Sequence, residues 1–304
     1  MRVVYMGTAP FAVPALRRIA PHVSLVVSQP DRPAGRGMRL QPSPVSQVAE
    51  ELGIPTFKPE RCRGEEVVAR LKAEDADIFL VAAYGQILRP AILDLPRHGC
   101  FNLHGSVLPR WRGAAPIQRA VMAGDTYSGV TVIKMDAGMD TGPVVTHQMV
   151  GIGPLETAGE LYARLAELAG DIAESWLPIL ASGNAILTPQ PEDGATHAAK
   201  MTPEDGQLKP DQEITELFDR YRACTPAPGA WMETPHGRLK VRRALPMHGA
   251  LAEPGTVVSV RPALVVAVAD GGLVLSEVQP EGRKAQSGVD FANGAHIEPG
   301  MRLF

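Results

Sequence analysis

The first 150 residues alternate short apolar runs with longer segments of helical periodicity, and this alternation is the strongest constraint on the fold. Four runs are almost continuously apolar, which is typical of strands buried on both faces of a parallel sheet. They are Val3–Met6, Leu25–Ser28, Ile78–Ala83 and Cys100–Leu103. Helical patterns accompany them over Pro14–Ile19, Pro44–Leu52, Glu65–Ala73 and Ala114–Met122. These patterns predict a Rossmann-like, doubly wound α/β domain with a mostly parallel sheet, to which Gly129–Met135 and the run over 143–150 add an antiparallel edge.

The pattern changes after residue 150. One long helix is expected from about Leu155 to Leu180, because its apolar residues form a single stripe and Gly183 follows as a stop signal. The next segment, from Thr188 to Pro210, is rich in proline and poor in large apolar residues, which indicates a linker.

The last third of the chain consists of short alternating runs separated by glycine and proline. After one more helix over Ile214–Arg222, such runs occupy residues 238–242, 255–260, 264–268 and 272–277. Strands at this spacing predict a small OB-like β-barrel. We therefore predict an N-terminal domain over 1–187, a linker over 188–210 and a C-terminal β-barrel domain over 211–304.

Composition excludes several classes of protein. The chain of 304 residues is long enough for two cores, and its formal net charge of −3 argues against a generally basic nucleic-acid-binding protein. Any RNA contact must therefore come from a local patch. Three well-separated cysteines without a C-x-x-C pair predict a reducing compartment, without disulfides or a cysteine-based zinc site. The first apolar run is too short for a signal peptide or a membrane span, so we expect a cytoplasmic protein without membrane contact.

An amide, an imidazole and a carboxylate stand at turns of the predicted sheet domain. Asn102 and His104 are two residues apart at the end of a predicted strand, so their side chains share a face at the edge where such sheets bind ligands. Asp140 lies in the glycine-rich loop Gly138-Met-Asp-Thr-Gly142. No nucleophile in a triad arrangement accompanies them. The set therefore suits an acyl transfer in which the substrate supplies the attacking group and the protein moves protons and stabilises an oxyanion.

Two other kinds of site are disfavoured by the residues around these loops. Gly7 follows the first strand, but the other glycines of a G-x-G-x-x-G fingerprint are missing, so no nicotinamide dinucleotide is expected. The D-x-G-x-D spacing of Asp136 and Asp140 is followed by apolar residues where a calcium loop needs ligands. We therefore expect no bound metal.

These motifs resemble those of the methionyl-tRNA formyltransferase family, one of the folate-dependent formyltransferases. The resemblance covers essentially the whole chain. Asn102, His104 and Asp140 are shared by all folate formyltransferases, whereas the run Gln29-Pro-Asp-Arg-Pro-Ala-Gly-Arg-Gly37 is a narrower marker. Further matches are the H-G-S-V-L-P-R-W-R-G-A-A-P and D-A-G-M-D-T-G-P segments, Val81–Gly85 and Pro226–Trp231. The chain departs from the family pattern at 205–210 and at Thr225, which leaves details of the linker open.

The resemblance implies transfer of the formyl group of 10-formyltetrahydrofolate to the α-amino group of methionine on initiator tRNA. Asn102 and a protonated His104 would donate hydrogen bonds to the oxyanion. Asp140 would orient His104 and assist in removing the amine proton. It also implies a catalytic N-terminal domain and a tRNA-binding β-barrel. We expect a monomer.

The resemblance further implies that folate binds along residues 84–88 and 106–109. The sequence there combines free backbone groups around Gly85 with apolar side chains, a mixture that a flat pterin requires. The predicted folate contacts are Tyr84, Gly85, Gln86, Ile87, Leu88, Ser106, Val107, Leu108 and Pro109. Without the resemblance, both segments are typical of ordinary core and turn.

One basic loop is predicted to bind the tRNA. Arg32, Arg36 and Arg39 lie in a stretch rich in glycine and proline. The resemblance implies that this loop enters the acceptor stem, with Arg36 near the first position. The planar guanidinium suits a phosphate or a base edge. A solvated loop is the alternative on composition alone.

A second basic set lies in the predicted β-barrel. Arg238, Lys240 and Arg242 alternate along a predicted strand, so they share a face that can contact phosphates. Residues 203–304 nevertheless hold 11 lysines and arginines against 13 aspartates and glutamates, so a solvated strand face remains an alternative.

Other functions remain open on the sequence alone. A sugar-nucleotide N-formyltransferase shares the amide, imidazole and carboxylate but does not need the Gly-Arg-Gly loop. The length of the chain disfavours a 10-formyltetrahydrofolate dehydrogenase, and a hydrolase is a further rival. A non-catalytic RNA-binding or folate-binding protein would have no reason to keep the three polar groups together.

Overall fold

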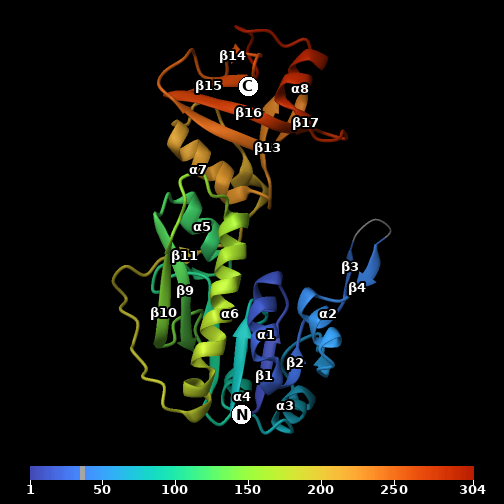
Figure 1. The fold of residues 1–304 in the computed structure, drawn as a ribbon, viewed down its shortest axis with the longest axis vertical. Helices are drawn as coiled ribbons and strands as arrows, with labels where there is room; N and C mark the ends of the chain where they lie inside the picture. Colours follow the sequence, from blue (N-terminus) through green and yellow to red (C-terminus); the bar gives the residue numbers. More distant parts are fainter. Residues whose placement is uncertain (35–37) are drawn as a thin grey trace. The chain divides into compact units, whose positions relative to one another are not determined.

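The computed structural model describes residues 1–34 and 38–304, and the chain divides into two compact units (Figure 1). The first unit comprises Met1–Pro116, Tyr127–Val150 and Tyr162–Ala198. The second comprises Ile117–Thr126, Gly151–Leu161 and Ala199–Phe304. The predicted division into an N-terminal domain (1–187), a linker (188–210) and a C-terminal domain (211–304) stays a prediction.

A seven-stranded sheet, in the order β10-β9-β7-β6-β1-β2-β5, forms the centre of the first unit. β1 pairs in parallel with β2 and β6, β6 with β7, and β2 with β5, whereas β9 runs antiparallel to β7. The predicted parallel sheet with an antiparallel edge is confirmed. The strands are β1 Val3–Gly7, β2 Val23–Val27, β5 Thr56–Phe57, β6 Ile78–Ala82, β7 Cys100–His104, β9 Tyr127–Lys134 and β10 Val144–Gly151.

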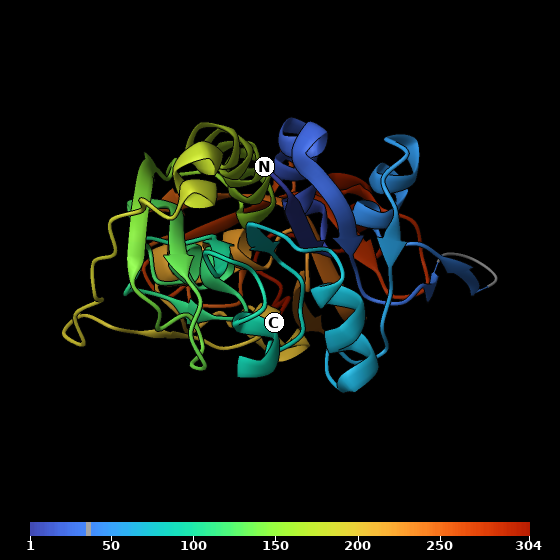
Figure 2. The same ribbon diagram turned by 90° about the horizontal axis from the view of Figure 1, so that it is seen from below.

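Helices cover both faces of this sheet: α1, α2 and α6 lie on one side, and α3 and α4 lie on the other (Figure 2). Val4 and Met6 of β1 join a cluster with residues of α3 and α4, while the Tyr5 hydroxyl between them donates to the Ala12 carbonyl at 2.6 Å. Burial on both faces explains the continuous apolar runs. The helices are α1 Val13–Ile19, α2 Pro44–Glu51, α3 Glu65–Lys72, α4 Pro90–Leu93, α5 Pro116–Met122 and α6 Ala158–Ser182, with 3₁₀ turns at Pro10–Ala12 and Ala20–His22.

Two small strand pairs occur where the sequence predicts loops. β3 (Arg32–Ala34) and β4 (Arg39–Gln41) form an antiparallel pair, so Arg32 and Arg39 lie on paired strands. Arg36 lies outside the described residues. β8 (Arg112–Gly113) pairs in parallel with β11 (His197–Ala198), which fixes part of the predicted linker against the first unit.

The second unit is built on an antiparallel sheet in the order β12-β13-β16-β15-β14, with β17 beside β16. It confirms the second half of the predicted fold class. Leu239 and Val241 of β13 are buried in its core, together with residues of α7 and α8. Along the described part of the chain, no helix has the length and apolarity needed to cross a membrane. The elements are η3 Pro203–Gly206, α7 Ile214–Cys224, β12 Ala230–Thr234, β13 Gly237–His248, β14 Val257–Ser259, β15 Leu264–Val268, β16 Gly271–Pro280, β17 Gln286–Ser287 and α8 Gly288–Gly294.

A buried carboxylate ties together the amino ends of the central strands. The side chain of Glu74 is 8% exposed and accepts hydrogen bonds from Arg70 at 2.5 Å, Ser24 at 2.7 Å and Arg2 at 3.1 Å. Burial raises the pKa of Glu74, but the hydrogen bonds from its three partners outweigh burial and hold the pKa below its ordinary value. The ionised group therefore stabilises the fold above the ordinary pKa of glutamate. This contribution is lost as the pH falls through the pKa of the folded state.

Replacing Glu74 by Gln removes the charge and one acceptor oxygen. We expect the free energy of unfolding at pH 7 to fall by about 1–2 kcal/mol, since the arginine partners are partly exposed and their pairs are screened. In acid, below the folded-state pKa, the wild-type group is protonated as well, so the difference should shrink. Urea unfolding at both pH values measures this. Glu51→Gln, which breaks an exposed pair with Arg17, is the matched control. An equal loss at both pH values would contradict the role given to the charge.

Candidate active site

The structure brings together the three residues that the sequence predicts as catalytic. Asn102 and His104 lie at the end of β7, and the Asp140 carboxylate reaches both. Asn102 Nδ2 donates to Asp140 Oδ1 at 3.2 Å, and His104 Nδ1 lies 3.5 Å from Asp140 Oδ2. The backbone N–H of Gly113 also donates to Oδ2, at 2.9 Å. With His104 and Asp140 side chains only 6% and 15% exposed, the carboxylate is held mainly by protein donors.

The His104 ring is fixed from both edges. Its Nε2 lies 2.9 Å from the Trp111 carbonyl oxygen, opposite the edge that faces Asp140. Trp111 has φ of +66°, and its N–H donates to the Thr196 hydroxyl at 2.9 Å, so this unusual turn is held in place. Both ring nitrogens face acceptors, and an imidazole held in this way can carry a proton on either nitrogen. Within the described ranges, no three His, Cys, Asp or Glu side chains are grouped as metal ligands.

The loop that carries Asp140 is shaped by its own sequence. The Asp136 carboxylate accepts from the Gly138 N–H at 3.0 Å and from the Thr141 hydroxyl at 2.8 Å, which closes the turn. Asp140 itself has φ of +55°, a region that aspartate tolerates better than most residues. A Cβ on Gly142 would lie 1.8 Å from the Lys134 carbonyl oxygen, so only glycine fits there. The D-A-G-M-D-T-G motif therefore encodes the position of the carboxylate.

Gln190 is a site residue that the sequence analysis missed. Its Nε2 donates to the carbonyl oxygens of Asp140 and Gly142, both at 2.8 Å, and its Oε1 accepts from Arg112 Nε at 3.0 Å. It therefore joins the carboxylate loop to the turn that carries Gly113. The proline-rich segment around Gln190 has no helical or strand periodicity that would place its side chain. Its partners are 48 or more residues away, so no local motif indicates the contact.

The predicted folate segments are partly core and partly surface. Tyr84 and Leu88 are buried in the core, and the Ser106 hydroxyl donates to the Arg110 carbonyl at 2.7 Å. Ile87 is 77% exposed, and Val107 is half-buried. Leu108 is buried, Pro109 is half-buried, and Gly85 has φ of +79°. Of the side chains predicted to contact folate, Ile87 is thus the most exposed, whereas Tyr84, Leu88 and Leu108 are buried.

The side chains around residue 84 are held by a hydrogen-bond network of their own. The Tyr84 carbonyl accepts from the Thr8 hydroxyl and from Gln29 Nε2, both at 2.9 Å. The Gln86 amide oxygen accepts from the Cys62 N–H at 2.6 Å. Thr8 in the loop after β1 and Gln29 of the Q-P-D-R run therefore support the predicted folate segment, and Gln86 holds a neighbouring loop.

The predicted RNA-binding residues of β13 are exposed on one face, as their alternation requires. The guanidinium of Arg238 lies 3.8 Å from the centre of the Trp231 ring and pairs with Glu233 at 3.3 Å. Arg242 donates to the Gln279 side chain at 3.0 Å. Two of the three cations therefore have protein partners already.

The comparisons with known proteins agree with this geometry. The chain matches the formyl transferase family over residues 9–175 and the formyl transferase C-terminal domain over residues 200–296. It is 46% identical to the methionyl-tRNA formyltransferase of Methylobacterium sp. (strain 4-46), covering 100% of this chain and 99% of that protein. It is 45% identical to the corresponding protein of Symbiobacterium thermophilum, over 100% and 95%.

A solved structure shows the same fold at low sequence identity. The N-formyltransferase from Helicobacter canadensis, crystallised with folinic acid and dTDP-3-aminofucose, superimposes with a TM-score of 0.68 at 14% identity, over 90% of this chain and 98% of that one. This structure shows the fold alone, whereas the relatives at 45–46% identity and both family matches show the family. The chain therefore belongs to the methionyl-tRNA formyltransferase family.

Proposed function

We propose that the chain transfers the formyl group of 10-formyltetrahydrofolate to the α-amino group of methionine esterified to initiator tRNA. The observation that carries this proposal is the shared carboxylate of Asp140, which lies within reach of the Asn102 amide and the His104 imidazole. The identity to methionyl-tRNA formyltransferases over the whole chain supports the choice of acceptor. The product serves translation initiation, so we propose the cytoplasm as the compartment. We also propose that the protein works as a monomer.

The reaction needs one bond formed and one broken at the formyl carbon. The amine nitrogen attacks this carbon, and the carbonyl oxygen becomes an oxyanion. Among the described residues, the Asn102 side chain makes one hydrogen bond, to Asp140, so its second N–H is available to the oxyanion. The second donor to the oxyanion is His104, whose Nδ1 lies 3.5 Å from Asp140 Oδ2. When the bond to N10 of the folate breaks, N10 takes up a proton and the amine loses one.

Proton removal is the role proposed for Asp140. Its carboxylate accepts the amine proton directly or through one water, while it keeps His104 oriented. An α-amino group has an ordinary pKa of about 8, so a useful fraction is already unprotonated at pH 7. Neither a covalent nucleophile nor a strong base is therefore required. The folate donor would bind along residues 84–88 and 106–109, where the exposed Ile87 offers apolar surface.

A direct assay separates this function from the sugar-nucleotide alternative. Labelled 10-formyltetrahydrofolate is incubated with the protein and either charged initiator tRNA or an amino-sugar nucleotide. We expect label only on the methionyl-tRNA. Transfer to the amino sugar alone would replace the proposed function by the alternative, and binding of both ligands without transfer would favour a non-catalytic protein.

The catalytic residues can be tested one at a time. Asn102→Ala, His104→Ala and Asp140→Asn should each lower kcat by about 10² or more, because each removes an interaction with the transition state. Folate affinity should change far less. The exposed His147→Ala is the matched control and should keep wild-type turnover. Near wild-type kcat in His104→Ala would show that the imidazole has no part in the reaction.

The positioning role of Gln190 gives a second test. Gln190→Ala removes two hydrogen bonds to the carboxylate loop, so we expect kcat to fall about tenfold with KM for folate nearly unchanged. Glu192→Gln is the control, because Glu192 is 84% exposed and pairs with the same Arg112 at 3.4 Å. Steady-state kinetics with charged initiator tRNA measure both. A loss confined to KM, or an equal loss in both variants, would argue against a role in orienting Asp140.

The arginine loop is proposed to recognise the acceptor end of the tRNA. Arg32 and Arg39 lie on the paired strands β3 and β4, and Arg36 lies between these strands in sequence. Arg36→Ala should lower kcat/KM on charged initiator tRNA by about tenfold or more and leave folate binding intact. Arg36→Lys keeps the charge but loses the planar fork, so a bidentate contact predicts a substantial loss and a simple charge contact a mild one. Unchanged kcat/KM in Arg36→Ala would remove the loop from the recognition model.

A further inference from the structure

The carbonyl of Trp111 determines which nitrogen of the neutral His104 ring carries the proton. It lies 2.9 Å from Nε2, and a carbonyl oxygen can only accept, so Nε2 must be the donor in this contact. A neutral imidazole has a single N–H, and the contact assigns it to Nε2. Nδ1 is then the nitrogen that faces Asp140, at 3.5 Å from Oδ2. The backbone around Trp111 therefore controls the tautomer of the ring.

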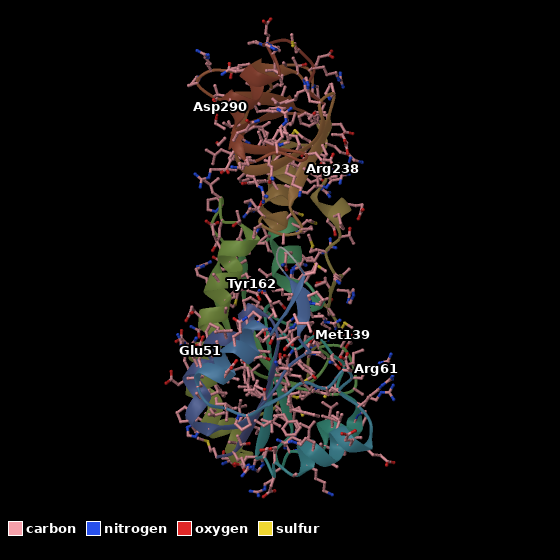
Figure 3. All side chains as sticks on the ribbon, turned by 90° about the vertical axis from the view of Figure 1, so that its right-hand side faces the viewer. Glu51, Arg61, Met139, Tyr162, Arg238 and Asp290 are labelled. Carbon is pink, nitrogen blue, oxygen red and sulfur yellow. The ribbon has the colours of Figure 1, made fainter. Side chains whose placement is uncertain are left out.

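This control is effective because the ring is almost fully enclosed by protein. His104 is 5% exposed, so bulk water has little access to Nε2 and cannot readily replace the carbonyl as acceptor. On the other edge, Nδ1 faces the loop of Asp140. Met139, the neighbour of Asp140, is 54% exposed and lies at the surface of the first unit (Figure 3). The two edges therefore differ, since Nε2 faces the backbone of a turn and Nδ1 faces a loop that reaches the surface.

The carbonyl points at His104 because Trp111 adopts a backbone conformation that tryptophan rarely takes. Its φ of +66° lies in the left-handed region, which bulky L residues avoid. Such a residue keeps this conformation only where its surroundings hold it. The two peptide groups on either side of the Trp111 Cα must therefore be fixed by other parts of the chain.

Thr196 binds both of these peptide groups. Its hydroxyl accepts from the Trp111 N–H at 2.9 Å, which fixes the peptide group before the Cα. Its carbonyl accepts from the Arg112 N–H at 2.9 Å, which fixes the peptide group after the Cα, the one that includes the Trp111 carbonyl. With both peptide groups held, the direction of the Trp111 carbonyl is fixed.

Ser106 assists Thr196 at the first of these peptide groups. Its hydroxyl donates to the Arg110 carbonyl at 2.7 Å, so this peptide group is bound at its oxygen by Ser106 and at its N–H by Thr196. Ser106 follows His104 closely in the chain, so a change there would disturb the backbone next to the ring itself. Thr196 belongs to the distant stretch 188–198 and acts on the ring through the turn, which makes it the cleaner position for a test.

We propose that Thr196 is a positioning residue for His104. By fixing the peptide groups on either side of Trp111, it holds the Trp111 carbonyl against Nε2 and keeps the neutral ring in the Nε2–H tautomer, with Nδ1 toward Asp140. A catalytic imidazole in the wrong tautomer, or turned away from its carboxylate, loses its function even though the residue is still present. The effect of Thr196 on turnover rests on the proposed function, whereas its effect on the ring does not.

The alternative is that Thr196 only stabilises the fold. Residue 196 precedes β11, whose pairing with β8 joins His197 to Arg112 and Ala198 to Gly113. A purely structural role predicts that removing the hydroxyl lowers the temperature of thermal unfolding without changing the His104 tautomer or kcat. The two roles therefore differ in what they predict for the ring.

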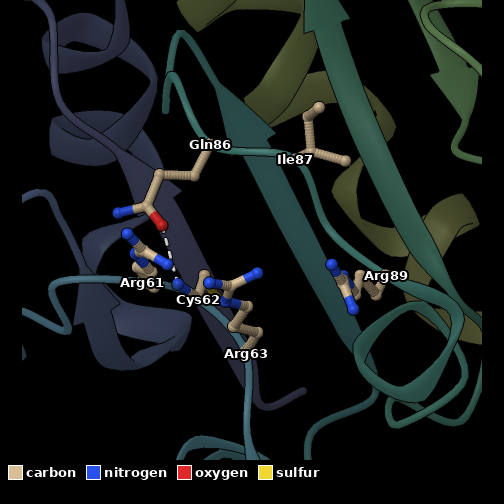
Figure 4. Close-up of a pocket in the computed structure, with 6 residues that line it drawn as sticks. All are labelled: Arg61, Cys62, Arg63, Gln86, Ile87 and Arg89. Carbon is tan, nitrogen blue, oxygen red and sulfur yellow. Dashed lines mark hydrogen bonds between the residues drawn. The ribbon is translucent and has the colours of Figure 1, made fainter.

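The first measurement is steady-state kinetics of Thr196→Val, which keeps a similar shape but loses the hydroxyl, and of Thr196→Ser, which keeps it. With charged initiator tRNA, we expect kcat to fall about tenfold in the valine variant and to stay within about threefold of the wild type in the serine variant. KM for the formyl donor should change less than about twofold. The reason is that the amide oxygen of Gln86, in the proposed folate segment, is bonded to the Cys62 N–H (Figure 4).

Thr188→Val is the matched control, because Thr188 is an exposed threonine of the same stretch that pairs with Val144 through its backbone. It should keep the wild-type kcat. A wild-type kcat in Thr196→Val would overturn the proposal. So would an equal loss in Thr196→Ser or in Thr188→Val, since the hydroxyl of Thr196 would then not be the cause.

The second measurement determines the tautomer directly. Nitrogen NMR of protein labelled at histidine distinguishes a protonated from an unprotonated ring nitrogen, and the His104 signals are those missing from His104→Ala. In the neutral wild-type ring we expect the proton on Nε2, and in Thr196→Val we expect a population with the proton on Nδ1. A neutral wild-type ring protonated on Nδ1 would contradict the proposal. An unchanged ring in a Thr196→Val variant that has lost turnover would contradict it as well.

A failure of the proposed function would be distinguishable, because the NMR measurement needs neither folate nor tRNA. If the wild type transfers no formyl group to methionyl-tRNA but Thr196→Val still alters the tautomer, the acceptor is wrong and the positioning role stands. If the wild type transfers the group and Thr196→Val matches it in kcat and tautomer, the function stands and the positioning role is overturned.

Discussion

The Asp140 carboxylate is the interaction on which the geometry of the site depends. A largely buried carboxylate is costly unless donors surround it, and here the donors come from separate segments of the chain. Asn102 reaches it from β7, and the Gly113 N–H reaches it from the turn that ends at β8. The same carboxylate faces His104. Because one group satisfies these contacts together, it sets the distance between the amide and the imidazole that are proposed to act on the oxyanion.

The scaffold behind this carboxylate includes a segment that looks like a linker. Gly113 has φ of +124°, and a Cβ there would lie 2.8 Å from the Ala198 carbonyl of β11, so the glycine that donates to Asp140 also packs against this strand. Gln190 and Thr196 reach the Asp140 loop and Trp111 from the same stretch. The stretch from 188 to 198 thus acts as structural support for the site, although its composition is typical of a connector.

The sequence predicted the elements whose pattern is local and missed those whose partners are distant. β1 and β6 were predictable because burial on both faces leaves a continuous apolar run. Asn102 and His104 could be placed because they end such a strand, and the turn residues around Asp140 could be recognised from glycine spacing. Gln190 could not be predicted, since its partners are 48 or more positions away. The strands β8 and β11 could not be predicted either, since Arg112 pairs with His197, 85 positions further along the chain, and two-residue strands carry no periodicity. Gln86 was expected to contact folate, yet its amide oxygen accepts from Cys62, a contact that only the folded loops reveal.

The buried ion pairs of Glu74 and the proposed catalytic residues lie at opposite ends of the parallel strands. At the amino ends, Glu74 collects three donors and holds the start of the sheet, and no reacting group is placed there. At the carboxyl end of β7, the Asn102 amide and the His104 imidazole both face the Asp140 carboxylate, and the proposed catalytic site lies there. The continuous apolar strands between the two ends supply the burial that keeps the sheet rigid, so that the proposed catalytic residues are held on a fixed scaffold.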